Sequence, residues 1–439
     1  MSAIAAPPVR RERLENGLTV LVASRPGVPL AAVRILVRAG SALDPGGRFG
    51  LAHLTSLAAR RGTRRRSGAR IDAEIEALGS ELGAGVDEDA ASVGLTAPVE
   101  ALPKVLEVLA DLVSVPTFPQ AQVEQLRRRE MASLANDLDE PGVVADRATL
   151  GAAYGTHPYG HPSEGRTRHL ASVRRSDLAQ FHRHHWRPSR ATLLVVGPVD
   201  VEAVLALARR RFSRWKGEPI CDLEIAPPAP PQGPAVVIVD QPELTQAQLR
   251  VAAPGYARSS PEYAAGVVTG AVLGGGFTSR LMEAIRVTRG LSYGVRARFA
   301  SGRVGGLFFV SSFTKVATAG ELVQVALDEL ARFRDGGPTE EELVRVRGYL
   351  GGLYPLSLET HEAWAEKLAE VELYGLPEDE VAGFTGRIAA VDAAACQALA
   401  RRYLPGERRV VVAVGPARVL APQLAAFGPV RVVAPRTVM

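Results

Sequence analysis

The 439-residue sequence is poor in cysteine, in lysine and in long apolar runs. Its two cysteines, Cys221 and Cys396, are too few for a disulfide framework or a four-thiolate zinc site, and they fit a reducing compartment. No apolar run approaches the roughly 20 residues that a membrane-spanning helix needs. The N-terminus lacks the basic and then apolar pattern of a secretory signal. With residue 1 as the natural start, these absences predict a cytoplasmic protein without a membrane partner.

Positive charge comes almost entirely from arginine. The 52 Lys+Arg and 47 Asp+Glu leave a net charge of +5, and only four positions are lysine. The densest basic run lies within residues 60–70 and has neither interleaved aromatic residues nor a nucleic-acid motif. We interpret this run as a solvated helix end and loop, and we expect no nucleic-acid partner.

A proline-rich stretch divides the chain into two nearly equal parts. Hydrophobic residues make up 46% and charged residues 23%, as in soluble globular proteins, and the length suggests two to four domains. Residues 218–234 hold five prolines in their last nine positions, which predicts a stiff, extended linker. We therefore expect one domain over residues 1–217 and another over residues 235–439.

The two parts repeat the same pattern. Residues 171–200 and 389–418 both run from an acid-capped helical segment through a basic and aromatic stretch to a β-branched strand that ends in Gly-Pro. Earlier in each part, over residues 90–112 and 305–332, an alternating strand precedes an amphipathic helix. The repeat predicts two homologous domains.

The order of strands and helices predicts the α+β class. Within each part, long helices separate the strands without strict βαβ alternation. The strands predicted at residues 18–22 and 31–37 are expected to be neighbours, joined by a loop that contains Arg25-Pro26-Gly27. This arrangement favours a largely antiparallel sheet with helices on one face.

The helical segment at residues 49–63 resembles the zinc helix of the M16, or pitrilysin-like, peptidases. That family carries His-x-x-Glu-His here, with two histidines on one helix face to bind zinc and a glutamate to deprotonate the bound water. In this sequence His53 stands at the first ligand position, Ser56 at the position of the base, and Leu57 at the second ligand position. The motif is therefore degenerate.

The third zinc ligand of the family is also missing at its usual distance. Counting from Leu57 places it at Ser133, within a helix predicted over residues 120–138. Glu130 and Asp137 lie about one turn to either side, but a carboxylate alone cannot replace the second imidazole. We expect this chain to hold no metal and no cofactor. His53 is then interpreted as a packed or hydrogen-bonded histidine.

Residues 273–295 resemble the corresponding segment of the M16 C-terminal domain, and here the family motif is intact. In that family an arginine and a tyrosine, which are Arg286 and Tyr293 in this sequence, help to bind the substrate carbonyl opposite the zinc. Both side chains are hydrogen-bond donors suited to a developing oxyanion. The glycines at 274–276 lack the rest of a phosphate-binding motif. They are expected to give a tight approach to a helix that Thr278 or Ser279 caps.

The remaining histidines are not expected to bind metal. His157 and His161 lie in a Thr-His-Pro-Tyr-Gly-His-Pro segment that cannot be helical, and we expect a structural turn there. His182, His184 and His185 precede a predicted strand and are interpreted as surface or interdomain residues.

The resemblance covers nearly the whole chain, from residue 15 to residue 415. It implies two α/β-roll domains of the LuxS/MPP-like metallohydrolase fold, which enclose a chamber together with a second two-domain chain. It further implies a non-catalytic subunit of a heterodimeric zinc metallopeptidase. A partner with intact His-x-x-Glu-His would hold the zinc, and Arg286 and Tyr293 would act on the peptide substrate in trans.

Two other functions stay open on the sequence. One is a peptidase-like scaffold or a peptide-binding pseudoenzyme without hydrolysis, which could be a homodimer. The other is a hydrolase with a different site, although no Ser/His/Asp or Cys/His spacing in the sequence supports it.

Overall fold

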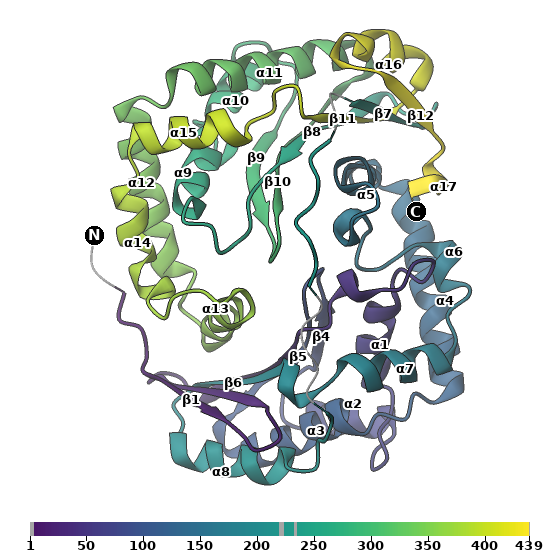
Figure 1. The fold of residues 1–439 in the computed structure, drawn as a ribbon, viewed down its shortest axis with the longest axis vertical. Helices are drawn as coiled ribbons and strands as arrows, with labels where there is room; N and C mark the ends of the chain where they lie inside the picture. The colour runs from purple at the N-terminus through teal and green to yellow at the C-terminus, as the bar shows by residue number, and fades with distance from the viewer. Residues whose placement is uncertain (1–3, 219–223, 232–234, 439) are drawn as a thin grey trace.

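Each half of the chain forms one six-stranded sheet that is covered by helices, as Figure 1 shows for the computed structural model. The structure describes residues 4–218, 224–231 and 235–438. The first sheet contains β1 Val9–Arg13, β2 Thr19–Ser24, β3 Leu30–Val37, β4 Gly83–Val86, β5 Ala91–Pro98 and β6 Ala191–Gly197. The second sheet contains β7 Ala235–Asp240, β8 Gln246–Pro254, β9 Val295–Ser301, β10 Gly306–Lys315, β11 Val410–Gly415 and β12 Val430–Val433.

Five strands of each sheet share one topology, and the sixth differs, because β1 precedes β2 and pairs with it antiparallel, whereas β12 follows β11 and pairs with β7 in parallel. The strand orders of the two sheets are β1-β2-β6-β3-β5-β4 and β12-β7-β11-β8-β10-β9, so β4 and β9 occupy equivalent edges. Most neighbouring strands are antiparallel, and the parallel pairs are β2–β6, β7–β11 and β7–β12. The expected repeat and the α+β class are therefore confirmed.

The expected pairing of the second and third strands is wrong. β6 lies between them and pairs with β2 in parallel and with β3 antiparallel. Every residue of β6 is buried, and its sequence Ala-Thr-Leu-Leu-Val-Val-Gly is apolar at almost every position. Such a strand is most stable at the centre of a sheet that is covered on both faces, so it separates two strands that are adjacent in sequence.

Helices follow the strands in the order that the sequence pattern predicts. In the first half they are α1 Leu51–Ala59, α2 Gly68–Glu76, α3 Leu102–Ser114, α4 Gln120–Asn136, α5 Pro141–Tyr154, α6 Thr167–Leu170, α7 Arg175–His185 and α8 Val201–Phe212. In the second half they are α9 Tyr263–Gly274, α10 Arg280–Met282, α11 Ala319–Gly336, α12 Glu340–Leu356, α13 His361–Tyr374, α14 Glu380–Ala390, α15 Ala393–Tyr403, α16 Ala417–Leu424 and α17 Pro435–Val438. A π-helical turn, η6 Glu283–Val287, follows α10, and a 3-10 turn, η4 Pro158–Gly160, follows α5. Across the described ranges, no helix is long and apolar enough to cross a bilayer.

One helix from each half packs on the sheet of the other half. Helices were expected on one face of each sheet; the outer face packs on helices of its own half, and the inner face is covered as well. On the inner face of the first sheet lies α13, whose Trp364 and Leu368 pack in the same cluster as Leu194. On the inner face of the second sheet lies α5, with Val144 and Ala148 in the buried cluster. Figure 1 shows α5 and α13 between the two sheets.

The expected linker at residues 218–234 lies partly outside the described residues. Its described part, residues 224–231, forms neither helix nor strand. Nε2 of His157 lies 2.9 Å from the carbonyl oxygen of Ala226, which ties this segment to the first half. The domain boundaries at 217 and 235 stay predictions.

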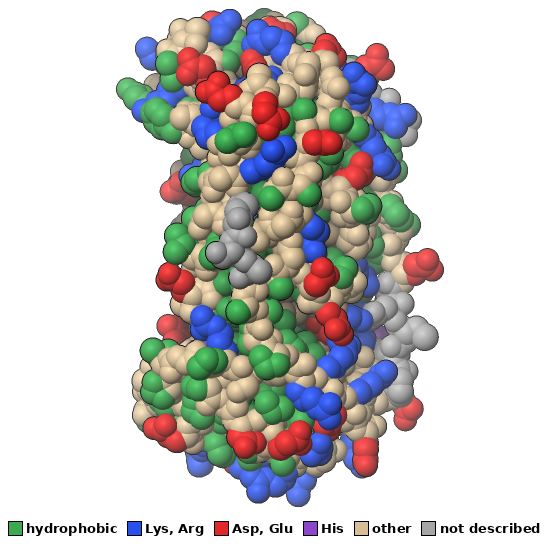
Figure 2. Space-filling view, turned by 90° about the vertical axis from the view of Figure 1, so that its left-hand side faces the viewer, with side chains coloured by type: hydrophobic (Ala, Val, Ile, Leu, Met, Phe, Trp, Pro, Cys, Tyr) green, Lys and Arg blue, Asp and Glu red, His purple; other side chains and the backbone are tan. Residues whose placement is uncertain are grey.

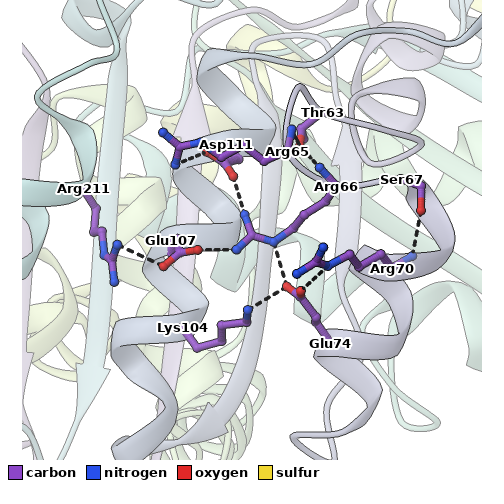
Figure 3. A network of polar contacts seen from close by, with 10 residues as sticks. All are labelled: Thr63, Arg65, Arg66, Ser67, Arg70, Glu74, Lys104, Glu107, Asp111 and Arg211. Carbon is purple, nitrogen blue, oxygen red and sulfur yellow. Dashed lines mark hydrogen bonds and ion pairs between the residues drawn. The ribbon is translucent and has the colours of Figure 1, made fainter.

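The basic run at residues 60–70 is not wholly solvated, because Arg66 lies in a buried network of ion pairs (Figure 3). Only 6% of Arg66 is exposed, and its guanidinium contacts Glu74, Glu107 and Asp111. Glu107 also lies 2.9 Å from Nη1 of Arg211 on α8. The network thus joins α2, α3 and α8, whereas Arg64 in the same run is exposed as expected.

Charges of both signs are interspersed on the face that Figure 2 shows. Many exposed arginines in the described part are paired with carboxylates, such as Arg209 with Glu12 and Arg70 with Glu74. The hydrogen bond from Lys104 lowers the pKa of Glu74 to about 2, so that carboxylate stays charged in its cluster. On the face that Figure 2 shows, Lys and Arg do not form a continuous basic stripe.

Candidate functional site

Backbone geometry fixes the start of the helix that carries His53. Gly50 precedes α1 with φ of 96°, and a Cβ there would lie 2.6 Å from the carbonyl oxygen of Glu164. The carboxylate of Asp44 accepts hydrogen bonds from the backbone N–H groups of Gly50 at 2.6 Å and Ala52 at 2.7 Å. Burial raises the pKa of Asp44 to about 7, although these backbone donors favour its charged form. Together these contacts hold the first turn of α1 in place.

His53 is hydrogen-bonded to Glu130 on α4. Nε2 of His53 lies 3.1 Å from Oε2 of Glu130, and both side chains are largely buried. The hydrogen bond from His53 holds the pKa of Glu130 below its usual value. The structure thus places Glu130, one turn before Ser133, as the carboxylate that faces the degenerate motif.

The other positions of the zinc motif do not supply ligands. Ser56 is buried, and its Oγ has no hydrogen-bond partner among the described residues. Leu57 packs against the first hydrophobic core, and Ser133 is exposed on α4. No group of three or more His, Cys, Asp or Glu in the described ranges could hold a metal ion. One imidazole and one carboxylate do not fit the three-ligand zinc site of an active peptidase.

Restoring the missing ligands tests this geometry. We expect a Ser56→Glu, Leu57→His variant to bind stoichiometric zinc, because residue 57 lies one turn from His53 on α1 and Glu130 already contacts His53. Elemental analysis after dialysis against zinc and then metal-free buffer gives the readout. The matched control adds His53→Ala to the same variant and should lose the metal. A restored variant that holds no more zinc than this control would show that residues 53, 57 and 130 do not converge.

Arg286 and Tyr293 are brought together at the surface of the second half. Nη1 of Arg286 donates a hydrogen bond of 3.1 Å to the carbonyl oxygen of Tyr293. The guanidinium also lies over the ring of Phe277, 4.5 Å from its centroid. Arg286 lies in the π-helical turn, and Tyr293, just before β9, is 81% exposed. The phenol is therefore available to another molecule.

Of the glycines before this pair, Gly274 makes a tight approach, but it ends the preceding helix α9 and packs on β9, whereas a tight approach to the following helix was predicted. A Cβ on Gly274 would lie 2.2 Å from the backbone nitrogen of Ala297, so α9 can approach β9 only with glycine at this position. Ser279 is the N-cap residue of α10, although its side chain makes no capping hydrogen bond.

The two predicted sites lie in different halves of the chain. Among the described residues, no hydrogen bond or ion pair joins His53 or Glu130 to Arg286 or Tyr293. The arginine and tyrosine therefore make no direct contact with the degenerate motif in the described part of this chain.

A cavity of about 1150 Å³ lies between the halves. One wall comes from α4, α5 and the segment around η4, and the other comes from β8, β9 and β10. Ser133 lines it from the first half, and Arg296 and Arg298 line it from β9. Sequence reasoning missed these two arginines. The alternating Val-Arg-Ala-Arg-Phe directly after the tyrosine motif is the signal that could have identified them.

The histidines outside the motif that the sequence singled out lie in two regions, the turn at His157 and His161 and the last turn of α7. The expected turn at His157 and His161 is present as η4, and His161 stacks on Phe49 at 3.9 Å. His184 is exposed, as expected. The interpretation of His182 as a surface or interdomain residue is wrong. His182 is buried, and its Nε2 lies 3.0 Å from the carbonyl oxygen of Val113. The helix α7 packs its inner side on the first core, and His182 lies on that side.

The burial of His182 predicts a pH effect on stability. Burial lowers the pKa of His182 to about 4, whereas an unfolded histidine titrates near 6.5. Below pH 6.5 the unfolded state therefore binds more protons, and the free energy of unfolding falls as the pH falls. For this histidine alone the loss between pH 7 and pH 5 should be about 2 kcal/mol.

Urea unfolding of the natural chain and of a His182→Gln variant at both pH values measures this loss. Glutamine can still donate to the carbonyl of Val113 but does not titrate, so the variant should lose about 2 kcal/mol less than the natural chain over this interval. Equal losses in the two proteins would contradict the prediction. His185, whose pKa burial also lowers to about 4, is present in both and cancels in the comparison.

Family models match both halves of the chain. A model described as insulinase, peptidase family M16, matches residues 19–165, and a model described as the peptidase M16 inactive domain matches residues 172–350. An uncharacterized zinc protease of Mycobacterium leprae is 30% identical over 84% of this chain and 83% of its own length. The mitochondrial-processing peptidase subunit beta of Bos taurus is 26% identical over 94% of this chain and 86% of its own length.

A solved structure has the same architecture along its whole length. The crystal structure of a peptidase M16 inactive domain from Pseudomonas fluorescens aligns with a TM-score of 0.87 and 26% identity, covering 93% of this chain and 98% of that chain. The similarity thus includes both sheets and the helices between them.

Proposed function

Because the chain belongs to peptidase family M16, we propose that it is the non-catalytic, substrate-binding subunit of a heterodimeric zinc metallopeptidase. One contrast carries this proposal. Of the two histidines in the family's zinc motif, only His53 is present, and it is hydrogen-bonded to Glu130. In contrast, Arg286 and Tyr293 are both present, are in contact with each other and lie at the surface. A chain that had lost all function would have no reason to keep the second pair while losing the first.

In the proposed pair, the metal belongs to a partner subunit with the intact His-x-x-Glu-His motif. Zinc there would polarise the scissile carbonyl and activate water. The role of this chain is to stabilise the charge that develops on the carbonyl oxygen. Arg286 has five N–H donors and uses one of them on the carbonyl of Tyr293, so others are free to donate to the substrate. The hydroxyl of Tyr293 supplies a second donor.

Prior positioning makes such donors effective. Phe277 and the carbonyl of Tyr293 hold the guanidinium of Arg286 from two sides, so little side-chain freedom is lost when substrate binds. A donor that is fixed before the reaction needs no reorganisation as charge develops. This is the physical reason for keeping the pair together on a rigid turn next to β9.

The surroundings of the pair support contact with a second chain. Phe277, over whose ring the guanidinium of Arg286 lies, is 62% exposed, and Val287, the residue after Arg286, is 56% exposed, so an apolar margin of these two side chains lies beside Arg286. Exposed apolar side chains that cluster around polar donors are typical of surfaces that bind another molecule. In the proposed pair, burial of this margin excludes water from the donors and strengthens their effect.

Reconstitution tests the proposal. We expect a mixture of this chain with an M16 subunit that carries the intact motif, encoded in the same genome, to hydrolyse unfolded peptides well above the rate of that subunit alone. The control replaces the glutamate of the partner motif by glutamine and should abolish activity in the same mixture. A mixture that is no more active than the intact-motif subunit alone would overturn the proposal and favour the scaffold or pseudoenzyme alternative.

A further inference from the structure

Two arginines on an edge strand line the cavity between the halves. Arg296 and Arg298 alternate along β9, so both side chains lie on the same face of the second sheet. Both are exposed. Within the described part of the chain, Arg296 makes no hydrogen bond or ion pair, and Arg298 makes no ion pair but lies over the ring of Phe309 at 4.7 Å. Their positive charge is not neutralised by the protein.

Other arginines of the same cavity are fully engaged. Nε of Arg250, on β8, lies 2.6 Å from Asp146 of α5, and its other nitrogens donate to the carbonyl oxygens of Leu249 and Gly142. These contacts hold α5 on the second sheet. Arg147 likewise contacts Asp137 at 2.8 Å. The spare positive charge of the cavity is therefore concentrated on β9.

Five carboxylates line the cavity, and within the described residues none of them forms an ion pair with Arg296 or Arg298. Asp137 and Asp146 are committed to Arg147 and Arg250, Glu164 also lies 3.7 Å from Arg147, and Asp87 accepts hydrogen bonds from the backbone N–H groups of Asp89 and Ala90. Glu88, which lines the cavity from the turn after β4, forms no ion pair with a described residue. Two cationic side chains on one wall and an unpaired carboxylate from the other half leave the cavity ready for a ligand that carries charge.

We propose that Arg296 and Arg298 form a carboxylate-binding subsite, which selects peptides that place an acidic side chain or a C-terminal carboxylate at this wall. Guanidinium groups match carboxylates in geometry and form charge-assisted hydrogen bonds with them. The guanidinium of Arg298 lies over the ring of Phe309, 4.7 Å from its centroid, and its N–H groups donate to no described residue, so they can donate to a ligand.

This inference rests on the proposed function, because Tyr293 sets the position of the scissile bond. β9 begins two residues after Tyr293, and a strand advances about 3.3 Å per residue. Arg296 and Arg298 therefore lie roughly 10 and 17 Å along the chain from Tyr293. An extended peptide advances by the same step, so the selected carboxylate lies roughly three to five residues from the scissile bond.

Charged residues on an edge strand also have a purely structural use. They prevent the edge from pairing with the edge of another sheet, and arginines on β9 would serve that purpose as well. In that case the arginines would not distinguish a carboxylate from an amide of the same shape. Discrimination between glutamate and glutamine is therefore the property to measure.

Binding of labelled peptides to this chain alone, followed by fluorescence anisotropy, separates the two uses. The probes are three nonapeptides of one Ala/Ser sequence: an amidated peptide with a central Glu, the same peptide with Gln, and the Gln peptide with a free C-terminal carboxylate. We expect one or both carboxylate peptides to bind about tenfold tighter than the amidated Gln peptide. The two carboxylate probes distinguish a side-chain from a C-terminal source.

Variants locate the effect. An Arg296→Ala, Arg298→Ala variant should bind all three peptides with equal affinity. Arg431→Ala is the matched control, because Arg431 is exposed on β12, the opposite edge strand of the same sheet, and it should keep the preference. The inference is overturned if the natural chain binds none of the peptides or binds all three equally, or if both variants weaken the preference alike. The proposed function is judged separately, by the activity of the reconstituted pair.

Discussion

Replacing Arg286 by alanine should lower kcat of the reconstituted pair about 10²- to 10³-fold and leave KM nearly unchanged. Removal of one donor from an oxyanion-binding site typically has an effect of this size, because the donor acts mainly in the transition state. Among the described residues, the side chain of Arg286 makes one hydrogen bond, to the carbonyl of Tyr293, and one ring contact, with the exposed Phe277, so the variant should fold normally. Steady-state kinetics with a quenched fluorescent peptide measures the change.

Arg289→Ala is the matched control for this experiment. Arg289 lies three residues further along the chain, carries the same charge and is exposed, and its Nη1 contacts only the carbonyl oxygen of Ala284. It should retain the full rate. Light scattering on each mixture shows whether the variant chain still associates with the partner. An Arg286→Ala chain that associates normally and restores the full rate would remove Arg286 from the proposed oxyanion site.

Replacing Arg66 by methionine should lower the free energy of unfolding by about 3–5 kcal/mol. Breaking a buried ion pair from one side leaves an uncompensated charge in a poorly solvated place, which is strongly destabilising. In this protein the charges left behind are those of Asp111, which is 5% exposed, and of Glu107. Figure 3 shows that Arg66 lies at the centre of the network, between α2 and α3. Urea denaturation followed by circular dichroism provides the measurement.

Arg65→Met is the control within the same network. Nη1 of Arg65 lies 3.3 Å from Asp111, but half of its side chain is exposed to solvent. Exposed ion pairs contribute about 0–1 kcal/mol, so this variant should be nearly as stable as the natural chain. Similar losses for Arg65→Met and Arg66→Met would contradict the prediction that burial of the charge, rather than its pairing, sets the effect.

The repeated halves could be predicted from the sequence, whereas the exchange of helices between them could not. Alternating or β-branched strands and amphipathic helices leave a local signal in each half. Which sheet a helix covers depends on contacts between residues far apart in the chain. For this reason the packing of α5 on the second sheet and of α13 on the first was not predicted. The place of β6 between β2 and β3 has the same origin, because strand order is set by burial of the whole sheet.

In the candidate site, too, features that depend on neighbouring residues could be predicted from the sequence, and features that depend on distant residues could not. The loss of the base at Ser56 and of a ligand at Leu57 is visible in the sequence, because motif spacing on one helix is a local property. The partner of His53 is not local: counting along the chain gives Ser133, but the structure places Glu130 against the imidazole. Arg66 was interpreted as part of a solvated run, but it is buried. Arg296 and Arg298 can be identified as candidate binding residues only from the structure, which shows that β9 lines a cavity. Single charged residues carry no sequence signal of burial.

The zinc content of the purified chain tests the central claim most directly. It is measured by elemental analysis of the peak from a size-exclusion column with light-scattering detection. That claim is that this chain has lost the metal and keeps only the arginine and tyrosine. The account predicts that the chain alone carries no stoichiometric zinc, and that its complex with an intact-motif subunit carries one zinc per pair. One zinc per chain in the absence of any partner would contradict it.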